Sequence, residues 1–343
     1  MICLGVESTA HTFGIGIVKE DNSAVRILAN AKDAYTTERE GIIPAEAAEH
    51  HRRVSQEVLE KALAQAGISE KDIDLVSYSQ GPGLGPCLRA GAEFAESLSK
   101  RLGKPLIGVN HCIAHLEIGR LVTGASDPVL LYASGANTQI IAFEGGKYRI
   151  FGETLDMGVG NMIDTFARHM GIGFPGGPKV YELALKGRNY IKLPYAVKGM
   201  DVSFSGILTN IKQKYDSGKY SAEDLCYSLQ ETVFAMLIEV SERAMAHCEK
   251  RELVLGGGVA CNRRLQEMAQ VMCSERNANC YIPPNALLVD NGAMIAWLGL
   301  LEYLSGVRMA PSEPLIKPYE RTDDIIVSWY SEKKRHFTIE KAA

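Results

Sequence analysis

The chain has 343 residues, enough for two compact domains or one large body with two lobes. Apolar residues make up 46% and charged residues 23%, a composition that excludes an intrinsically disordered protein. The 37 basic and 41 acidic side chains give a net charge of −4, which excludes a general positive field for nucleic acid, so any RNA contact must come from local basic patches or from partner proteins.

The first part of the chain alternates apolar strands with helices. Residues 2–7 and 13–18 are predicted strands joined by a small polar turn, which indicates a hairpin at the start of a sheet. A helix over 44–66, a strand over 74–79, a helix over 88–102, a strand over 105–109 and a helix over 111–121 follow. This alternation predicts an α/β fold with a mixed or parallel sheet.

The second part of the chain repeats the opening layout. Residues 130–143 resemble residues 4–18, because in both a glycine-containing polar turn joins two apolar strands. Helices are then predicted near 160–170, 178–187 and 206–215 and over 221–249, a strand over 253–255, and helices over 262–276 and 286–303. The spacing of about 126 residues indicates a duplicated unit rather than a solenoid.

Duplication predicts two similar lobes with a cleft between them. We expect an N-terminal lobe over residues 1–125 and a C-terminal lobe over 126–305, whose last helix packs back toward the cleft. Residues 306–343 are expected to form a tail.

The sequence shows no pattern typical of a signal peptide, a membrane span or a disulfide framework. The first ten residues lack the basic and long apolar regions of a signal peptide, and no apolar run reaches the membrane-spanning length of about 18 residues. The eight cysteines include no CxxC pair, in a chain too large to need disulfides. We expect a soluble, cytoplasmic protein with reduced thiols and no membrane contact.

A possible metal site is formed by His111 and His115, which one helical turn separates. The spacing also fits surface or capping histidines. A zinc protease would need HExxH, and Cys112 stands at the glutamate position, so that general base is missing. Two histidines underfill a site, and the oxygen candidates are Tyr132 and Asp290, although an Asp before an apolar helix is often an N-cap.

Four glycine-rich turns offer backbone N–H groups to phosphate: residues 134–138, 158–161, 174–178 and 256–262. Each alone fits an ordinary turn and none matches a Walker or Rossmann pattern, but the set of four favours nucleotide binding. Asp156 and Asp164, which flank the second turn, fit a metal ligand, a ribose contact or a helix cap. Basic stretches with tyrosines near 186–198 and 212–219 fit RNA contact or a solvated face.

Taken in order, these motifs resemble one family. They include GVESTAHT, SQGPGLGPCLRAG, GVNHCIAHLEIG, LYASGANTQ, VKGMDVSFSGILT, GGGVACNRRL and DNGAMIAWLGLL, and the likeness covers roughly residues 1–325. The family is the tRNA threonylcarbamoyladenosine synthases, known as TsaD in bacteria and as the catalytic subunit of the KEOPS complex in archaea and eukaryotes. The ESTAHT and VKGMDVSFSG segments are closer to the archaeal and eukaryotic branch.

The resemblance implies a fold and an activity. The fold is the duplicated two-lobed α/β fold of actin, Hsp70 and sugar kinases, with a cleft between the lobes. The activity is that of a transferase, which moves threonylcarbamoyl from threonylcarbamoyl-AMP to the adenosine 3′-adjacent to the anticodon of ANN-decoding tRNAs.

The resemblance also implies site residues. The catalytic residues fall on His111, His115 and Asp290, and with Tyr132 these would bind one divalent metal, iron in preference to zinc. Positions that contact the adenine nucleotide, either threonylcarbamoyl-AMP or ATP, fall on Glu7, Ser8, Thr9, Tyr132, Ala133, Ser134, Gly135, Ala136, Asn137, Asp164, Gly177 and Asn262. Two positions depart from the family pattern. Ala136 replaces a usual glycine, and Tyr181 replaces a usual glutamate, so that the hydroxyl of Tyr181 or the carboxylate of Glu182 would take the ribose contact.

The implied partners are tRNA, a small atypical kinase subunit, dimerising and accessory subunits of KEOPS, and an upstream synthase of threonylcarbamoyl-AMP. In some archaea the kinase is fused to the carboxyl end, and Lys333, Lys334 and Arg335 fit either the start of such a linker or a frayed terminus. Two rival functions are a metalloprotease, which HxxxH alone suggests, and a nucleotide-sensing scaffold.

Overall fold

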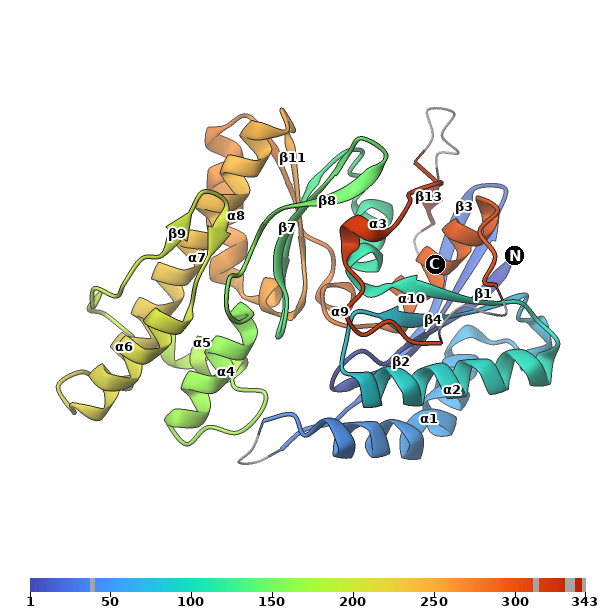
Figure 1. Ribbon diagram of the computed structural model, residues 1–343, viewed down its shortest axis with the longest axis horizontal. Helices are drawn as coiled ribbons and strands as arrows, with labels where there is room; N and C mark the ends of the chain where they lie inside the picture. Colours follow the sequence, from blue (N-terminus) through green and yellow to red (C-terminus); the bar gives the residue numbers. More distant parts are fainter. Residues whose placement is uncertain (38–40, 311–314, 331–336, 341–343) are drawn as a thin grey trace.

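The computed structural model describes residues 1–37, 41–310, 315–330 and 337–340. The described chain forms two lobes, each built on one sheet, which lie side by side along the longest axis (Figure 1). The basic residues expected at the start of a linker, 333–335, lie outside the described residues.

The first lobe is a mixed six-stranded sheet in the order β13-β3-β2-β1-β4-β5. Its strands are β1 (Ile2–Glu7), β2 (Thr12–Asp21), β3 (Ala24–Ala34), β4 (Leu75–Gly81), β5 (Leu106–Asn110) and β13 (Thr338–Ile339). β1, β2 and β3 pair antiparallel, whereas β4 and β5 continue from β1 in parallel.

Helices cover both faces of this sheet. α1 (Pro44–Ala66) and α2 (Gly85–Leu102) pack on one face, and α3 (His111–Thr123) and α10 (Gly292–Leu304) on the other (Figure 1). α1 matches its predicted range, because Pro44 stands in its first turn and Gly67, with φ +64°, ends it. Between α1 and β4 lies the short 3₁₀ turn η1 (Glu70–Asp72).

The second lobe repeats the strand order of the first. Its sheet runs β12-β11-β6-β7-β8, so that β6, β7 and β8 form an antiparallel meander and β11 and β12 continue from β6 in parallel. These strands are β6 (Val129–Ala133), β7 (Thr138–Glu144), β8 (Lys147–Glu153), β11 (Glu252–Gly256) and β12 (Asn279–Tyr281). Read from β8, the order corresponds strand by strand to β3-β2-β1-β4-β5, which confirms the predicted duplication.

The remaining elements of the second lobe surround a large apolar core. They are α4 (Val159–His169), α5 (Gly177–Ala184), α6 (Ser205–Asp216), α7 (Ala222–His247), α8 (Arg263–Glu275), α9 (Asn285–Leu288), the small strands β9 (Val197–Lys198) and β10 (Asp201–Val202), and the 3₁₀ turns η2 (Gly258–Cys261) and η3 (Thr322–Asp324). Among the described helices, none combines the length and apolar character needed to cross a bilayer.

The outer strands β3, β8 and β12 were missed from the sequence. β3 has alternating exposed and buried positions that include Arg26, Asn30 and Lys32, and β8 carries Lys147 and Arg149. Each of these two strands is the third strand of its antiparallel meander and has part of its surface in solvent. The continuous apolar run that identifies a central strand is therefore absent.

The prediction of a single helix over 286–303 is wrong, because the structure has two helices there, α9 and α10. Residues 289–291 separate α9 from α10. The break arises at Asn291, whose side-chain oxygen accepts a hydrogen bond from the amide of Met294 at 3.0 Å and so caps α10. Asp290 precedes this cap and is therefore free of the capping role that an Asp in this position often has.

α10 returns to the first lobe, although the predicted second lobe extends to residue 305. Glycines allow its backbone to touch the sheet. A Cβ on Gly16 would lie 2.0 Å from the amide nitrogen of Ala293, and a Cβ on Gly5 would lie 2.1 Å from that of Ala296. The start of α10, and with it Asp290, is thereby held against β1 and β2.

We predict that Gly16→Ala lowers the free energy of unfolding by about 3 kcal/mol, because the new methyl group meets backbone that has no room to move. Urea denaturation measures the change. Gly206→Ala is the matched control, because a Cβ there meets nothing within 4 Å and should stabilise α6 by up to about 1 kcal/mol. Equal stability of the two variants would contradict the close contact.

Candidate functional site

The site is built on the junction between β5 and α3. Asn110 ends β5 and caps α3, since its side-chain oxygen accepts hydrogen bonds from the amides of Cys112 and Ile113 at 3.0 and 3.2 Å. His111 is therefore the first residue of α3, and His115 follows one turn later. The two rings lie 4.8 Å apart between centroids, and both side chains are buried.

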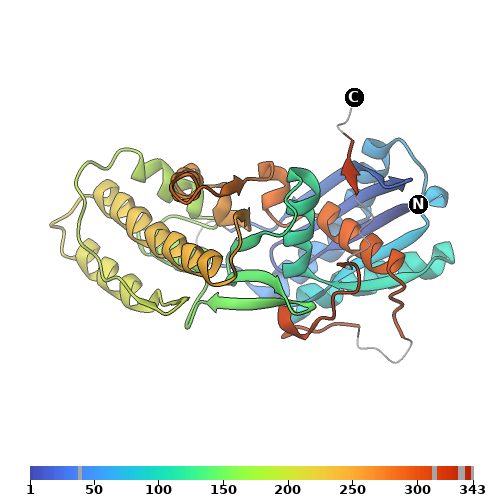
Figure 2. The ribbon, with the colours of Figure 1, turned by 90° about the horizontal axis from the view of Figure 1, so that it is seen from above.

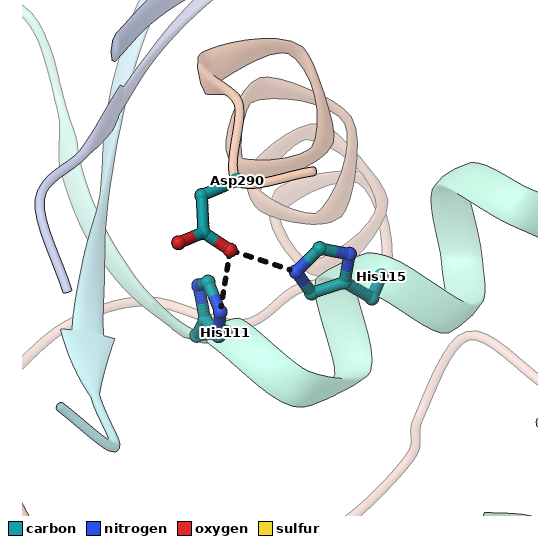
Figure 3. Close-up of side chains that lie close together, drawn as sticks. All are labelled: His111, His115 and Asp290. Atoms are coloured by element: carbon teal, nitrogen blue, oxygen red, sulfur yellow. Dashed lines mark hydrogen bonds and ion pairs between the residues drawn. The ribbon is translucent and has the colours of Figure 1, made fainter. Parts of the chain in front are cut away.

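Asp290 completes a cluster with the two histidines (Figure 3). Its Oδ1 lies 3.5 Å from Nε2 of His111 and 3.3 Å from Nε2 of His115. Two ligands of a tetrahedral ion with bonds of about 2.0–2.1 Å lie roughly 3.3 Å apart, so these spacings suit one metal ion. Among the described residues this is the only group of three or more His, Cys, Asp or Glu side chains placed for a metal.

Tyr132 stands beside this cluster at the end of β6. Its hydroxyl lies 3.0 Å from Nε2 of His111. Burial raises the pKa of Tyr132 well above its ordinary value, so the phenol stays protonated while no cation is near. The four side chains that the resemblance implied as metal ligands therefore lie together, and their nitrogen and oxygen atoms suit iron or zinc.

Glu7 lies behind His111, on the side of the ring that faces away from Asp290. It is fully buried, and its Oε2 accepts a hydrogen bond from Nδ1 of His111 at 2.9 Å. Its Oε1 accepts from the amide and the hydroxyl of Thr9 at 2.7 and 2.5 Å. A carboxylate on Nδ1 fixes the ring and directs Nε2 toward Asp290, which is the usual arrangement behind a metal-binding histidine.

Ser8, which lies between Glu7 and Thr9 in the turn after β1, also faces the interior of the first lobe. The amide of Ser8 donates to Oγ of Ser79 at 3.0 Å, and a Cβ on Gly91 would lie 2.0 Å from Oγ of Ser8. The Ser8 side chain is therefore directed toward α2. Glu7 and Ser8 are thus both buried in the first lobe, and the nucleotide role that the resemblance implied for Glu7, Ser8 and Thr9 stays a prediction.

Electrostatics differ between the two histidines. Burial alone would lower the pKa of His111, but the charge and hydrogen bond of Glu7 and the charge of Asp290 outweigh burial and raise it to about 9. Burial lowers the pKa of His115, although the hydrogen bond to Asp290 opposes it. For Asp290, burial is outweighed by the His115 hydrogen bond and by both histidines, which together hold its pKa below the usual range.

A protease mechanism is disfavoured by the surroundings of Cys112. Burial raises the pKa of the Cys112 thiol to about 12, so it stays neutral and cannot replace the missing glutamate. Glu7, the nearest carboxylate behind His111, already accepts hydrogen bonds from His111 and Thr9.

Three of the glycine-rich turns meet one another. The amides of Gly160 and Asn161 donate to the carbonyls of Ser134 and Gly135 at 3.0 and 2.9 Å. A Cβ on Gly257, whose φ is +90°, would lie 2.3 Å from the carbonyl oxygen of Ala133. Residues 133–137, 158–161 and 256–258 therefore form one group of turns at the ends of β6 and β11.

At the tip of this group of turns, two backbone amides are available to donate hydrogen bonds to a ligand. Gly135 and Ala136 are exposed, and no described residue accepts a hydrogen bond from either amide. Ala136 also does not have a positive φ, which explains why alanine is tolerated at this position. Ser134 and Asn137 close the turn, because the hydroxyl of Ser134 donates to the carbonyl of Asn137 at 3.1 Å.

A pocket between α5, α7 and α8 brings together Gly177 and Asn262. It is partly open to solvent and is lined by Ile163, Gly177, Val180, Leu229, Gln230, Val233, Phe234 and Asn262. Gln230 was missed as a site residue. It is buried, and its Oε1 accepts a hydrogen bond from Nδ2 of Asn262 at 2.8 Å. A glutamine on the apolar face of a long helix was the available signal.

The other predicted nucleotide residues lie outside this lining. Oδ1 of Asp164 accepts from the amides of Gly176 and Gly177 at 2.8 and 3.2 Å and so holds the turn that supplies Gly177. Tyr181 is half-buried on α5. Glu182 is exposed and pairs with Lys179 at 2.7 Å.

Asp156 is a structural cap. Its carboxylate accepts hydrogen bonds from the amides of Phe204 and Ser205, which lie at the start of α6, and from the hydroxyl of Ser203 at 2.6 Å. Partial burial opposes these bonds, but they lower the pKa of Asp156. The capping interpretation is confirmed for this residue.

Fold and site together define a duplicated α/β protein with a candidate metal centre where its two lobes meet. Solved structures share the fold. These are HypF from Thermococcus kodakarensis (14% identical, TM-score 0.62, 89% of this chain and 48% of that chain) and the Clostridium difficile activator of 2-hydroxyisocaproyl-CoA dehydratase with bound ADPNP (12%, 0.53, 91% and 100%). The expected two-lobed fold is confirmed.

Closer similarity is found in sequence. A family model described as tRNA N6-adenosine threonylcarbamoyltransferase, TsaD, matches residues 25–297. A Thermococcus kodakarensis protein of that name is 57% identical over 96% of this chain and 100% of its own length. A Methanocaldococcus jannaschii protein, named as a probable bifunctional tRNA threonylcarbamoyladenosine biosynthesis protein, is 51% identical over 97% of this chain and 61% of its own length.

The chain therefore belongs to the tRNA N6-adenosine threonylcarbamoyltransferase family. The expectation of a transferase that makes threonylcarbamoyladenosine in tRNA is confirmed at this level.

The paired charges of Glu7 and His111 predict a pH-dependent stability in metal-free protein. The pKa of His111 is raised from 6.5 to about 9, so the stabilisation is complete below pH 6.5 and is lost as the pH rises through about 9. The loss should be about 3 kcal/mol. Urea unfolding with a chelator at the two ends of this range measures it.

Glu7→Gln should remove most of that dependence. Glu49→Gln, whose carboxylate is 77% exposed, is the control and should retain it. A wild-type stability that does not fall across this range would show that Glu7 and His111 are not coupled.

Proposed function

We propose that the chain transfers threonylcarbamoyl from threonylcarbamoyl-AMP to N6 of the adenosine that follows the anticodon in ANN-decoding tRNAs, with one divalent metal held by His111, His115, Asp290 and Tyr132. In this reaction the amine attacks the carbamoyl carbon. The bond from that carbon to the phosphate oxygen breaks, AMP leaves with the electron pair, and N6 loses a proton. Iron is the expected metal, in preference to zinc.

The observation that carries the proposal is the convergence of these four side chains, with Glu7 behind them, at the junction of the lobes. Their spacing fits one ion, and the chain is 57% identical to a protein named for this transfer. A metal there would supply a Lewis acid that polarises oxygen atoms and neutralises charge on the departing phosphate. The chain's own contribution is to orient the donor and exclude water.

The donor's phosphate suits the tip formed by Gly135 and Ala136. Two adjacent exposed amides that have no acceptor among the described residues are available to an anion. Tyr132, at the end of β6, belongs to the same strand end and reaches His111. This strand end is thus the place where phosphate and metal would meet.

The adenine base suits the pocket that contains Gly177, Gln230 and Asn262. Its wall is mostly apolar, with Val180, Val233 and Phe234, and the two amide side chains supply donors and acceptors for base edges. We assign the ribose to the region near Asp164, Tyr181 and Glu182, which lie on the adjoining elements α4 and α5.

Partners are proposed from the relatives and the charge. The net charge of −4 requires that basic surface for tRNA be local or be provided by other proteins. The bifunctional relatives contain a further part beyond the 61% matched here, which supports a companion protein such as the expected small kinase. We also keep three predictions that rest on the sequence and its resemblance. These are an interaction with dimerising and accessory subunits, supply of the donor by an upstream synthase, and a cytoplasmic location.

The transfer assay follows labelled threonine from threonylcarbamoyl-AMP into unmodified ANN-decoding tRNA. We predict that His111→Ala lowers transfer by more than about 100-fold and removes the bound metal, because a ligand and its Glu7 contact are lost. His169→Ala, which removes an exposed histidine bonded to Asp216, should leave both unchanged. Full activity and full metal content in His111→Ala would contradict the assignment.

The nucleotide pocket gives a separate prediction. Gln230→Ala should weaken binding of AMP about tenfold, because Asn262 loses its partner and the base loses a polar contact. Metal content should stay at the wild-type level. Titration calorimetry measures both variants, with Gln270→Ala on the exposed face of α8 as control. Unchanged affinity for AMP would place the base elsewhere.

A further inference from the structure

Within the tail, residues 315–330 cross from the first lobe to the second, which Figure 2 shows as a red segment reaching the green strands. At its start, the amide of Lys317 donates to the carbonyl of Gln80 at 2.8 Å, and the amide of Gly83 donates to Pro318 at 3.2 Å. A Cβ on Gly81 would lie 1.9 Å from the carbonyl oxygen of Lys317. The tail is thus pressed against the end of β4.

The middle of the tail lies against the second lobe. Arg321 pairs with Glu153 of β8 at 3.3 Å, and Lys147 of β8 donates to the carbonyl of Asp323 at 3.2 Å. Between these contacts Thr322 is buried and interacts with the side chain of Cys112. The tail therefore touches both sheets and the first turn of α3.

The same segment contacts α3 at its start and in its middle, and the chain just beyond its end. At the first end, Asn110, the cap of α3, donates from Nδ2 to Oε2 of Glu320 at 3.1 Å. In the middle of α3, Oε1 of Glu117 accepts from Nε1 of Trp329 at 2.7 Å, and beyond the helix the hydroxyl of Tyr330 donates to the carbonyl of Ser126 at 2.8 Å. Glu117 lies two residues after His115.

Glu117 joins several elements. Its buried carboxylate accepts from Arg120 at 3.0 Å and from the hydroxyl of Tyr148 on β8, and its carbonyl accepts from Trp297 of α10 at 3.1 Å. A buried carboxylate needs such donors to offset its lost hydration. Loss of the Trp329 donor therefore loosens the helix that carries both histidines.

The ring of Tyr330 extends the contact. It stacks on Phe143 with centroids 3.8 Å apart, and the guanidinium of Arg120 lies 4.3 Å from its centroid. By contrast, Tyr319 of the same segment is 92% exposed. The tail thus offers one anchored tyrosine and one exposed tyrosine for comparison.

We propose that residues 315–330 form an interlobe strap, in which Trp329 and Tyr330 are positioning residues that hold α3 and its metal-binding histidines in place. This inference rests on the proposed metal site. According to this inference the metal site depends on the tail. A protein or chain extension that displaces residues 315–330 would therefore change the affinity of the site for metal.

The test uses the full chain and the double variant Trp329→Phe/Tyr330→Phe, which keeps an aromatic ring at both positions and removes the O–H donor of Tyr330 and the N–H donor of Trp329 together with part of the indole. Two readouts are measured: hydrogen exchange of the α3 amides in metal-free protein, and affinity and visible absorption with cobalt(II) alone as probe. We expect about tenfold faster exchange in α3, unchanged exchange in α1, about tenfold weaker cobalt binding and an altered cobalt spectrum. Tyr319→Phe should match the wild type in every readout.

The outcomes separate the two hypotheses. Exchange in α3 and cobalt binding equal to those of the wild type would overturn the strap while leaving the metal site intact. Absence of cobalt binding in the wild type would overturn the metal site, and the exchange of α3 would then still decide whether the strap holds the helix. Faster exchange spread equally over α1 and α3 would also overturn the strap, because it would show general loosening.

Discussion

The hydrogen bond between Glu7 and Nδ1 of His111 joins the two parts of the molecule on which the site depends. Glu7 ends the first strand and His111 begins the helix that leads to the second lobe, 104 residues later. Burying a carboxylate costs several kcal/mol unless donors surround it, and here His111 and Thr9 provide them. The contact fixes which nitrogen of His111 faces Asp290, and so it sets the chemistry of the cluster.

Asp290 reaches the same point by a different constraint. The start of α10 touches the backbone of β1 and β2, where only glycine at positions 5 and 16 leaves room. Asn291 caps α10, so that Asp290 stands just before the helix and its Oδ1 reaches both histidines. Duplication supplies the last component, since Tyr132 lies near the end of β6, the strand that corresponds to β1. The site therefore draws on both repeats and on the helix that returns between them.

Local signals in the sequence were sufficient for much of this. Pro44 and Gly67 delimit α1, the two hairpins reveal the repeat, and the spacing of His111 and His115 identifies one helix face. Where local patterns misled, long-range contacts decided the structure. The apolar run through 286–303 hides the break at Asn291, and the buried position of Glu7 depends on its partner in α3.

Other features had no local signal at all. Gln230 lines a pocket only because α5 and α8 close around α7, and the tail has no apolar period that would identify Trp329 as an anchor. The turn after β1 is a further example, since no local pattern predicts that Glu7 contacts His111 and that the amide of Ser8 donates to Ser79. Sequence patterns predict the elements that carry chemistry, whereas packing determines which atoms of those elements meet.

The most direct test of this account is anomalous X-ray diffraction from crystals of the protein grown with iron(II), and separately with zinc(II), without added nucleotide. The account predicts one anomalous peak bonded to Nε2 of His111, Nε2 of His115 and Oδ1 of Asp290, with Nδ1 of His111 still donating to Glu7. A peak at another set of residues, or no peak between these three side chains in either metal, would contradict it.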